Sequence, residues 1–384
     1  MKKICVVITA RPSYSRIKSL LTAINQNPNL ELQLILGASA LLERYGSVID
    51  TIKADGFQPT EIIHMVIEGG DLSTSAKSTG LGIIELSTAF NNLKPDIVLT
   101  VADRFETIAT AIAASYSNIP LAHVQGGEIS GSIDEKVRHA VSKLSDIHFV
   151  ATKKSKERLI KMGESIDSVF LTGCPSIDIV KTVIENSLFK DFNPFDSYGG
   201  VGNKFDPKSG YIVVLQHPVT TEYADTSYQI GQTLSAIQQL NQPTFWFWPN
   251  VDAGSDKISK SIRTYRENKK LENVYFLKNV SPEDFIKLLI NSKCLVGNSS
   301  AGIRECSYIG TPVVNIGNRQ IGREKGLNVI DSKYQSKQIL YSVEKQISHG
   351  NFAQETLYGD GSAGINISNL LEEKSPSINK KLSY

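Results

Sequence analysis

Short apolar runs rich in β-branched residues alternate with longer amphipathic segments along the whole chain. Such runs are typical of buried strands, and the apolar spacing of the longer segments is typical of helices of roughly ten to fifteen residues. The predicted strands are Ile4–Ile8, Leu32–Leu36, Ile97–Val101, Leu121–Val124, Ile147–Val150, Val169–Leu171, Tyr211–Leu215, Thr244–Phe247, Val274–Phe276, Cys294–Val296 and Pro312–Ile316. The predicted helices include Ser75–Leu93, Phe105–Tyr116, Ser155–Met162, Ser281–Ile290 and Ala301–Tyr308. This alternation predicts an α/β fold whose parallel sheets carry helices on both faces.

A break in the alternation suggests two domains. The 384 residues exceed what one hydrophobic core usually serves, and residues 187–208, rich in Gly, Asn, Asp, Pro and Ser, form the predicted linker. We expect two doubly wound Rossmann-like domains, residues 1–186 and 209–355, that face a cleft and bind ligands at the carboxyl ends of their strands. Residues 356–384 hold one more helical pattern without a following strand, and we expect this segment to pack back on the first domain.

Composition and charge are those of a soluble globular protein, with 41% hydrophobic and 21% charged residues. A net charge of +2 gives no electrostatic reason to expect nucleic-acid or membrane binding. No stretch reaches the ~20 apolar residues that cross a bilayer, and the first apolar run is too short for a signal peptide. The four cysteines form no CxxC pair, which favours reduced thiols. We therefore expect a cytoplasmic protein.

Two loops, one in each half, have the character of phosphate sites. In Thr100–Glu106 and in Val296–Glu305, an apolar run ends abruptly in small and charged residues that open a predicted helix. Backbone N–H groups and the helix dipole can hold a phosphate at such a point. The simplest interpretation is that both loops bind one ligand that contains a diphosphate.

Ionisable and polar residues follow several predicted strands of the first half. They are Arg11 and Ser13, then Asp103, Arg104 and Glu106, then His123, Gln125 and Glu128, and finally Asp134, Arg138 and His139 at a helix start. Any one group is also explained as a helix cap or a solvated salt bridge, because acids stabilise helix starts. Four groups at the same edge of one predicted sheet favour a functional site.

The second half carries a matching set. His217 directly follows a strand, and Pro218 forces the chain out of it, so a cationic histidine there would neutralise a leaving phosphate or simply lie in a surface loop. The other candidates are Asn250, Asp252 and Ser255 past a strand end, Ser299 and Ser300 for phosphate, Glu305 for ribose hydroxyls, and Arg319 and Arg323 for charge-assisted contacts. For each of these, a helix cap or a solvated charge is the alternative.

Several chemistries lack their sequence signatures. Gly80 and Gly82 approach a dinucleotide fingerprint, but the third glycine is missing and the pair sits inside a helical pattern. The sequence contains no HExxH motif and no P-loop, and His123 and His139 alone do not make a metal site. We therefore expect no nicotinamide cofactor and no metal.

In these blocks the chain resembles the hydrolysing UDP-N-acetylglucosamine 2-epimerases, sialic-acid-pathway relatives of the glycosyltransferase-B architecture, over nearly its whole length. The matching blocks are Asp103–Phe105, His123 with Gly126–Glu128, Asp134 with Arg138–His139, Thr172–Ser176, Gln216–Thr221, Asn250–Ser255, Gly297–Ser300 with Arg304–Glu305, and Arg319–Glu324. Non-hydrolysing relatives look like Asp-Thr-Thr-Thr where this chain has Asp103–Glu106, so the resemblance favours the hydrolysing branch.

The resemblance implies a two-step reaction. A base removes the C2 proton of a nucleotide-linked 2-acetamido sugar while the nucleoside diphosphate leaves C1; water then adds at C1 and C2 is reprotonated from the opposite face. By position, Asp103 and Asp134 would be the acid–base carboxylates, Gln125 and Glu128 further catalytic candidates, and His217 would lie against the diphosphate. The implied nucleotide contacts are Arg11, Arg104, Asn250, Asp252, Ser299, Ser300, Glu305 and Arg319, and the implied sugar contacts are Ser13, Arg138 and His139.

Two departures from the family pattern bear on the substrate and mechanism. Gln125 stands where the family has a glutamate, and an amide cannot exchange a proton at neutral pH, so Glu128 takes over that function or Asp103 and Asp134 suffice. Ser13 replaces an acidic residue that would grip a sugar hydroxyl, which would admit a 4-acetamido-6-deoxy sugar of the kind used for legionaminic-type acids.

Several alternatives therefore stay open. The sugar is N-acetylglucosamine or a 2,4-diacetamido counterpart, and the nucleotide is UDP or GDP. A glycosyltransferase of similar architecture and a non-catalytic sugar-nucleotide sensor are the competing functions. The resemblance favours a homodimer or homotetramer.

Overall fold

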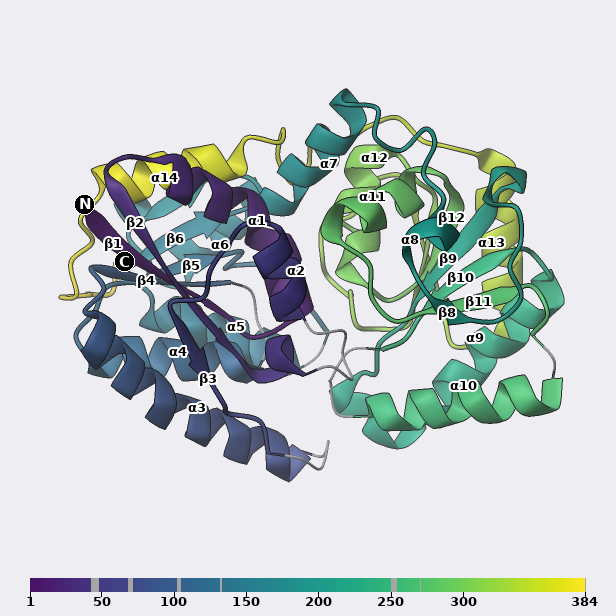
Figure 1. The fold of residues 1–384 in the computed structure, drawn as a ribbon, viewed down its shortest axis with the longest axis horizontal. Helices are drawn as coiled ribbons and strands as arrows, with labels where there is room; N and C mark the ends of the chain where they lie inside the picture. Colours follow the sequence, from purple (N-terminus) through teal and green to yellow (C-terminus); the bar gives the residue numbers. More distant parts are fainter. Residues whose placement is uncertain are drawn as a thin grey trace. The chain divides into compact units, whose positions relative to one another are not determined.

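The structure is a computed structural model that describes residues 1–42, 48–67, 72–101, 105–131, 133–249, 254–269 and 271–383. The chain divides into two compact units, each built on its own seven-stranded sheet (Figure 1). The first unit comprises Met1–Glu128, Ile133–Ile179 and Tyr358–Tyr384, and the second comprises Ile129–Ser132 and Val180–Leu357. The α/β expectation is confirmed.

The sheet of the first unit is parallel throughout, with the strand order β3-β2-β1-β4-β5-β6-β7. Its strands are β1 (Lys2–Ile8), β2 (Leu30–Gly37), β3 (Glu61–Ile63), β4 (Ile97–Val101), β5 (Leu121–Val124), β6 (Ile147–Val150) and β7 (Val169–Leu171). The strand order reverses between β1 and β4, which is where doubly wound sheets open a crevice for ligands.

Helices cover both faces of this sheet (Figure 1). They are α1 (Arg11–Gln26), α2 (Val48–Ala54), α3 (Leu72–Leu93), α4 (Phe105–Tyr116), α5 (Ile133–Leu144), α6 (Lys153–Lys161) and α14 (Ala363–Glu373). Helix α7 (Pro175–Glu185) begins in this unit and ends in the second. Alternate residues of β1 explain the layering: Ile4 and Val6 pack in the core of α1, α2 and α14, whereas Cys5 packs in the core of α3 and α4. Burial of each aliphatic side chain, such as that of Ile4 or Val6, contributes about 1.5–3 kcal/mol to the free energy of folding.

Helix α14 lies against α1 and is held at both ends. At its N-terminal end the carboxylate of Asp178 accepts hydrogen bonds from the N–H groups of Ala363 (3.0 Å) and Gly364 (2.7 Å). At its C-terminal end the ammonium of Lys2 donates to three carbonyls, each at 2.8 Å. These bonds complement the orphan groups and the dipole of the helix, so residues far apart in sequence are fixed together.

The sheet of the second unit has the order β14-β13-β12-β9-β10-β11-β8, in which only β8 runs antiparallel among the described strands. The strands are β8 (Gly200–Val201), β9 (Tyr211–Leu215), β10 (Thr244–Phe247), β11 (Val274–Leu277), β12 (Ser292–Gly297), β13 (Val313–Ile316) and β14 (Val329–Ser332). The reversal of order falls between β9 and β12. This is the Rossmann arrangement, and its ligand crevice is expected at the carboxyl ends of these two strands.

The helices of this unit are α8 (Pro194–Ser197), α9 (Thr226–Leu240), α10 (Ser255–Lys269), α11 (Pro282–Ile290), α12 (Glu305–Ile309) and α13 (Ser336–His349). Helices α9, α10 and α13 share one core with the strands. On β10, Phe245 and Trp246 are fully buried, as expected for a core strand. Phe245 lies in an aromatic cluster with Phe195 and Tyr211. Residues 194–197 and 200–201 of the predicted linker thus form α8 and the edge strand β8.

Two sequence expectations differ from the structure. The strands β3, β8 and β14 were not expected; they have three, two and four residues at or near sheet edges and are mostly not buried, so they lack an apolar run. The single helix expected over Ala301–Tyr308 is wrong: a 3₁₀ turn at Ser300–Gly302 precedes the short α12. There the carbonyl of Ser300 accepts N–H groups from both Ile303 and Arg304, which tightens the turn. Within the described ranges, no helix is long and apolar enough to span a membrane.

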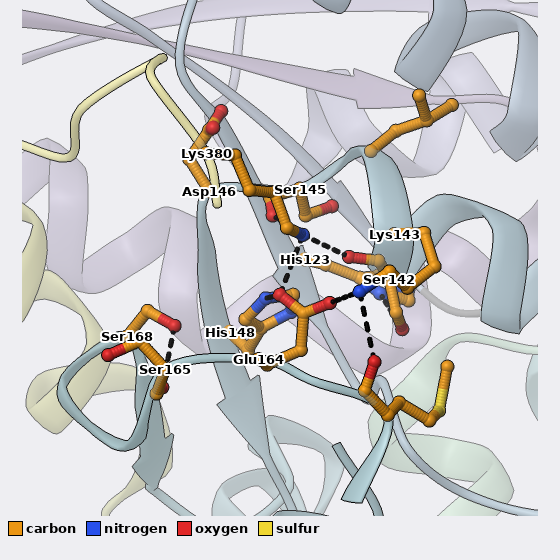
Figure 2. Close-up of polar contacts among 12 residues, drawn as sticks. His123, Ser142, Lys143, Ser145, Asp146, His148, Glu164, Ser165, Ser168 and Lys380 are labelled. Atoms are coloured by element: carbon orange, nitrogen blue, oxygen red, sulfur yellow. Dashed lines mark hydrogen bonds and ion pairs between the residues drawn. The ribbon is translucent and has the colours of Figure 1, made fainter. Parts of the chain in front are cut away.

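An ionic cluster around the buried carboxylate of Glu164 joins β6, α5 and the segment after α14 (Figure 2). The side chain of Glu164, 2% exposed, accepts from Lys143 Nζ (2.6 Å), His148 Nε2 (3.0 Å) and Lys380 Nζ (2.6 Å). Burial alone would raise the pKa of Glu164, but hydrogen bonds from these three partners hold the pKa at about 2. Burial lowers the pKa of His148 below its usual 6.5, despite the hydrogen bond to Glu164.

We expect folding stability to fall as the pH drops below about 6.5, the unfolded-state pKa of histidine. Because the folded protein holds His148 neutral, the unfolded chain binds the extra proton, and each pH unit below that value costs about 1.4 kcal/mol while His148 stays neutral. Glu164 adds a separate loss below its unfolded pKa of about 4.5 as the pH approaches 2. Chemical denaturation of wild type and His148→Gln between pH 7.5 and 5 measures the effect. If the free energy of unfolding fell equally with pH in both proteins, His148 would not be the cause of the pH dependence.

Candidate functional site

The loops after β9 and β12 are locked together by one buried amide. The N–H of His217 donates to Oδ1 of Asn298 (2.7 Å), and Nδ2 of Asn298 donates to the carbonyl of His217 (2.8 Å). Asn298 is fully buried and its own N–H donates to the carbonyl of Leu215 (3.2 Å). These bonds hold the backbone of His217 at the switch point of the second sheet. The backbone position of His217 therefore does not depend on contacts of its imidazole ring.

Gly297 permits this close approach. Its φ is +141°, and a Cβ atom built there would lie 2.1 Å from the carbonyl oxygen of Leu215. Any side chain would push β12 away from β9 at the point where the Asn298 bonds form. Asn298 itself was not among the predicted contacts, although it lies inside the Gly297–Ser300 block, because a local pattern does not reveal a partner 81 residues away.

The predicted phosphate serines open a tight turn. Ser299 Oγ accepts the N–H of Ala301 (3.2 Å) and so caps the 3₁₀ turn that begins at Ser300. With only a 3₁₀ turn and five residues of α12 behind it, this loop has a weaker helix dipole than a long helix would supply. Hydroxyls and backbone N–H groups are thus the main means by which the loop could bind phosphate.

The loop after β13 supports the same turn. Arg319 Nη1 and Gln320 Nε2 both donate to the carbonyl of Asn298, at 3.2 and 2.8 Å. Glu305 begins α12, and its Oε2 is shielded from solvent without a hydrogen bond to any residue that the structure describes. A carboxylate in that state retains the capacity to accept hydrogen bonds from ligand hydroxyls. The structure therefore brings His217, Ser299, Ser300, Glu305 and Arg319 to one edge of the second sheet, whereas Asn250 and Asp252 lie outside the described residues.

In the first unit, the loop after β5 carries Gln125 in a left-handed backbone conformation (φ +67°). The side chain is buried, and its Nε2 donates to Sγ of Cys174 at 2.9 Å. Its Oε1 forms no hydrogen bond within the described part of the chain. The amide thus has one end anchored, and the other end can accept a hydrogen bond from a ligand.

Helix α5 is tied to this loop by a buried arginine. Arg138 is fully buried, and its Nη1 donates to the carbonyl of Glu128 (3.0 Å) and to Oε2 of Glu135 (3.1 Å). The other oxygen of Glu135 pairs with Nε2 of His139 (2.8 Å). Asp134, partly exposed, lies in the first turn of the same helix. The structure therefore brings together Glu128, Asp134, Arg138 and His139, with Glu135, absent from the predicted contacts, orienting two of them.

Arg11 and Ser13 open α1 directly after β1, beside β4 in the sheet. Burial lowers the pKa of Arg11 to about 10, so the guanidinium remains cationic at neutral pH. The first turn of α1 contains no acidic residue, so the positive charge of Arg11 adds to the positive end of the helix dipole. That edge of the sheet favours an anionic ligand group. Asp103 and Arg104, predicted to follow β4 at the same edge, lie outside the described residues.

Comparison with known proteins identifies close sequence relatives. A family model described as UDP-N-acetylglucosamine 2-epimerase matches residues 22–372. The chain is 35% identical over 361 residues to the UDP-N,N'-diacetylbacillosamine 2-epimerase (hydrolyzing) of Legionella pneumophila, covering 94% of this chain and 93% of that protein. It is 30% identical over 361 residues to the UDP-N-acetylglucosamine 2-epimerase of Neisseria meningitidis, covering 94% and 92%.

Solved structures show the same architecture. A crystal structure of the UDP-GlcNAc 2-epimerase from Neisseria meningitidis bound to UDP-GlcNAc superposes with a TM-score of 0.78 at 18% identity, covering 97% of this chain and all of that one. An S. aureus MnaA structure with UDP gives a TM-score of 0.73 at 19% identity, covering 98% and 99%. At these identities the structural likeness shows the fold, and the sequence matches carry the family.

Proposed function

Because the chain belongs to the UDP-N-acetylglucosamine 2-epimerase family, we propose that it is a hydrolysing 2-epimerase of a nucleotide-linked 2-acetamido sugar. The principal substrate is UDP-N-acetylglucosamine, which would yield N-acetylmannosamine and UDP. The match of the family model to residues 22–372 carries this conclusion, since it spans both units.

A 2,4-diacetamido sugar linked to UDP or GDP is the second substrate candidate. The relative at 35% identity is named for UDP-N,N'-diacetylbacillosamine, and another at 31% over 334 residues, from Campylobacter jejuni, is named for GDP/UDP-N,N'-diacetylbacillosamine. Ser13, in place of the acidic residue that would bind a sugar hydroxyl, supports the same candidate. The products would be the free 2-epimer and the nucleoside diphosphate, as in legionaminic-type acid routes.

The proposed chemistry proceeds by elimination and rehydration. A carboxylate removes the C2 proton as the C1–O bond to the diphosphate breaks, which leaves a 2-acetamidoglycal. Water then adds its hydroxyl to C1 while a carboxylic acid on the other face delivers a proton to C2. The carboxylate that this leaves takes up the proton of the water, and the first carboxyl group loses the C2 proton to solvent, which completes hydrolysis with inversion at C2. We assign the two proton transfers to Asp103 and Asp134, with Glu128 as the third carboxylate available.

Gln125 has a binding role in this proposal, because an amide cannot carry the proton. Its anchored Nε2 and its open Oε1 support hydrogen bonding to a substrate N–H or hydroxyl. Arg138, His139 and Ser13 are the proposed sugar contacts beside it. The fixed network of Arg138 and Glu135 supports a rigid site, which acid–base catalysis requires.

The second unit supplies the proposed nucleotide contacts. His217 stabilises the negative charge that develops on the departing diphosphate, and Ser299 and Ser300 bind phosphate oxygens. Glu305 accepts hydrogen bonds from the ribose hydroxyls. Its buried Oε2, which has no hydrogen-bond partner among the described residues, supports that role. Further nucleotide contacts proposed from the sequence are Asn250, Asp252 and Arg319 of this unit, together with Arg11 and Arg104 of the first unit.

Proton NMR in D₂O tests the function directly. The protein is incubated separately with UDP-N-acetylglucosamine and with UDP- and GDP-linked 2,4-diacetamido sugars, without an acceptor. We expect release of nucleoside diphosphate, anomeric signals of the free 2-epimer and deuterium at C2. Transfer only in the presence of an acceptor would instead identify a glycosyltransferase, and binding without turnover a sensor.

We also propose a cytoplasmic homodimer or homotetramer. The four free, buried cysteines fit a reducing compartment, because none forms a disulfide. Light scattering coupled to size-exclusion chromatography measures the assembly.

A further inference from the structure

Lys380, in the segment that follows α14, uses all three of its N–H donors inside the first unit. Its Nζ donates to the carbonyls of Ser142 (3.0 Å) and Ser145 (2.6 Å) and pairs with Oε2 of Glu164 (2.6 Å). Figure 2 shows the ammonium between these groups. A saturated ammonium of this kind is held in one position, unlike a solvated surface lysine.

Two of these acceptors lie at the C-terminal end of α5. The last carbonyls of a helix lack partners within it and carry the negative end of its dipole, so a cation there is stabilising. Neighbouring carbonyls of this end are also occupied, Val141 by the hydroxyl of Ser145 (2.7 Å) and Leu144 by that of Ser115 (3.4 Å). Lys380 therefore completes the C-terminal cap of α5 from outside the helix.

Glu164 explains why the lysine stays charged in a shielded place. Its carboxylate is 2% exposed, and without Lys380 it would keep only Lys143 and His148 as partners. Burial lowers the pKa of Lys380 from its usual value, and the hydrogen bond to Glu164 opposes that shift. Buried ion pairs add little net stability, but they fix geometry because a displaced charge is costly.

The same turn of α5 contacts both β5 and the loop that follows it. Ser142 Oγ lies 3.1 Å from Nδ1 of His123, the two sharing a hydrogen bond. Gly126 packs on both: a Cβ atom built there would lie 2.9 Å from His123 Nδ1 and 3.0 Å from Ser142 Oγ. One turn earlier in the helix, Arg138 donates a hydrogen bond to the carbonyl of Glu128. The loop 125–128 thus contacts α5 at Gly126 and at Glu128, whereas Gly127 between them lies against α6.

We propose that Lys380 is a positioning residue for catalysis: it sets the place of α5, and with it Asp134 and the loop 125–128. The inference rests on the proposed function, since it takes Asp134 and that loop as parts of the acid–base machinery. Lys380 acts through the helix and contacts neither the substrate nor the reacting atoms.

Lys380→Met removes the cap, and Lys143→Met is the matched control. Both variants take one ammonium from Glu164, but Lys143 bonds otherwise to the carbonyl of Met162, so its loss leaves the α5 carbonyls capped. We expect Lys380→Met to lower kcat about 10- to 100-fold, the size of effect that small displacements of catalytic groups produce. The Kd for the free nucleoside diphosphate should stay within twofold. Lys143→Met and Lys381→Met, on the exposed neighbour, should keep wild-type kcat.

Hydrogen–deuterium exchange without substrate gives an independent readout. Amides of 133–144 should exchange faster in Lys380→Met than in Lys143→Met, and Lys380→Arg should restore both protection and most of kcat. If Lys380→Met gives no soluble protein, Lys380→Gln, which retains an N–H donor, takes its place in the same comparison.

An unchanged kcat with unchanged protection of α5 would overturn the proposal, as would equal losses in the Lys380 and Lys143 variants. Asp134→Asn in the same assay separates this failure from failure of the proposed function. If Asp134→Asn abolishes turnover while Lys380→Met is fully active, only the positioning role is wrong. If wild type itself turns over none of the sugar nucleotides, the function is wrong.

Discussion

Asp134→Asn should lower kcat for sugar-nucleotide hydrolysis by about 10²- to 10⁴-fold, the usual contribution of one acid–base group. Asparagine keeps the size of the side chain in the first turn of α5, but it cannot accept or return a proton. Substrate binding should change little, because the bonds of Glu135 to Arg138 and His139 stay in place in this variant. Steady-state release of nucleoside diphosphate, with deuterium at C2 followed by NMR, measures both steps.

Asp50→Asn is the matched control for this variant. Asp50 also lies in the first turn of a helix of the first unit, α2, and is exposed. The same chemical change there should leave kcat within a factor of about two, because surface substitutions of this kind have small effects. Turnover by Asp134→Asn at half the wild-type rate or more would remove Asp134 from the mechanism and leave Asp103 and Glu128 as the carboxylates to test.

His217→Ala should reduce kcat by about 10²- to 10³-fold, as the loss of one group that stabilises developing charge does. The substitution removes only the ring, because Asn298 holds the backbone N–H and carbonyl of this residue. The lost step is departure of the diphosphate, so quench-flow detection of the nucleoside diphosphate should show a slowed first turnover. The affinity for the free diphosphate should also fall.

His349→Ala provides the comparison within the same unit. His349 ends α13 and is exposed, stacking on Phe352 away from the loops after β9 and β12. Its loss should leave the first turnover unchanged. A His217→Ala protein with a wild-type burst of diphosphate would show that the charge of the leaving group is stabilised elsewhere, with Arg319 as the next residue to replace.

Interior strands and edge strands differed in how well local pattern revealed them. The runs that became β1, β9 and β12 are buried on both faces, so each is apolar throughout and bounded by turn residues. The strands β3, β8 and β14 are short and largely unburied, and only pairing with a neighbour makes them strands. The 3₁₀ turn after β12 also escaped prediction, because its shape depends on the hydrogen bond from the N–H of Ala301 to Ser299 Oγ and on the bond from the N–H of Arg304 to the carbonyl of Ser300.

The site followed the same division. Residues directly after strands, such as His217 and Ser299, were expected at one sheet edge because parallel strands end together. Their supports were not expected: Asn298 binds His217 across 81 residues, and Lys380 caps α5 across 238. Such pairs have no local sequence pattern, because the order of the strands in the sheet determines which residues far apart in sequence come into contact.

The amino-acid sequence by itself determined the α/β class, the interior strands, the family and the set of candidate side chains, because these depend on local periodicity and on motifs read in order. Only the tertiary structure decided which groups touch: the amide of Asn298 between β9 and β12, and the ammonium of Lys380 at the end of α5. The physical reason is that a buried hydrogen bond needs two groups within about 3 Å, and strand order and helix packing, which no short segment encodes, set that distance.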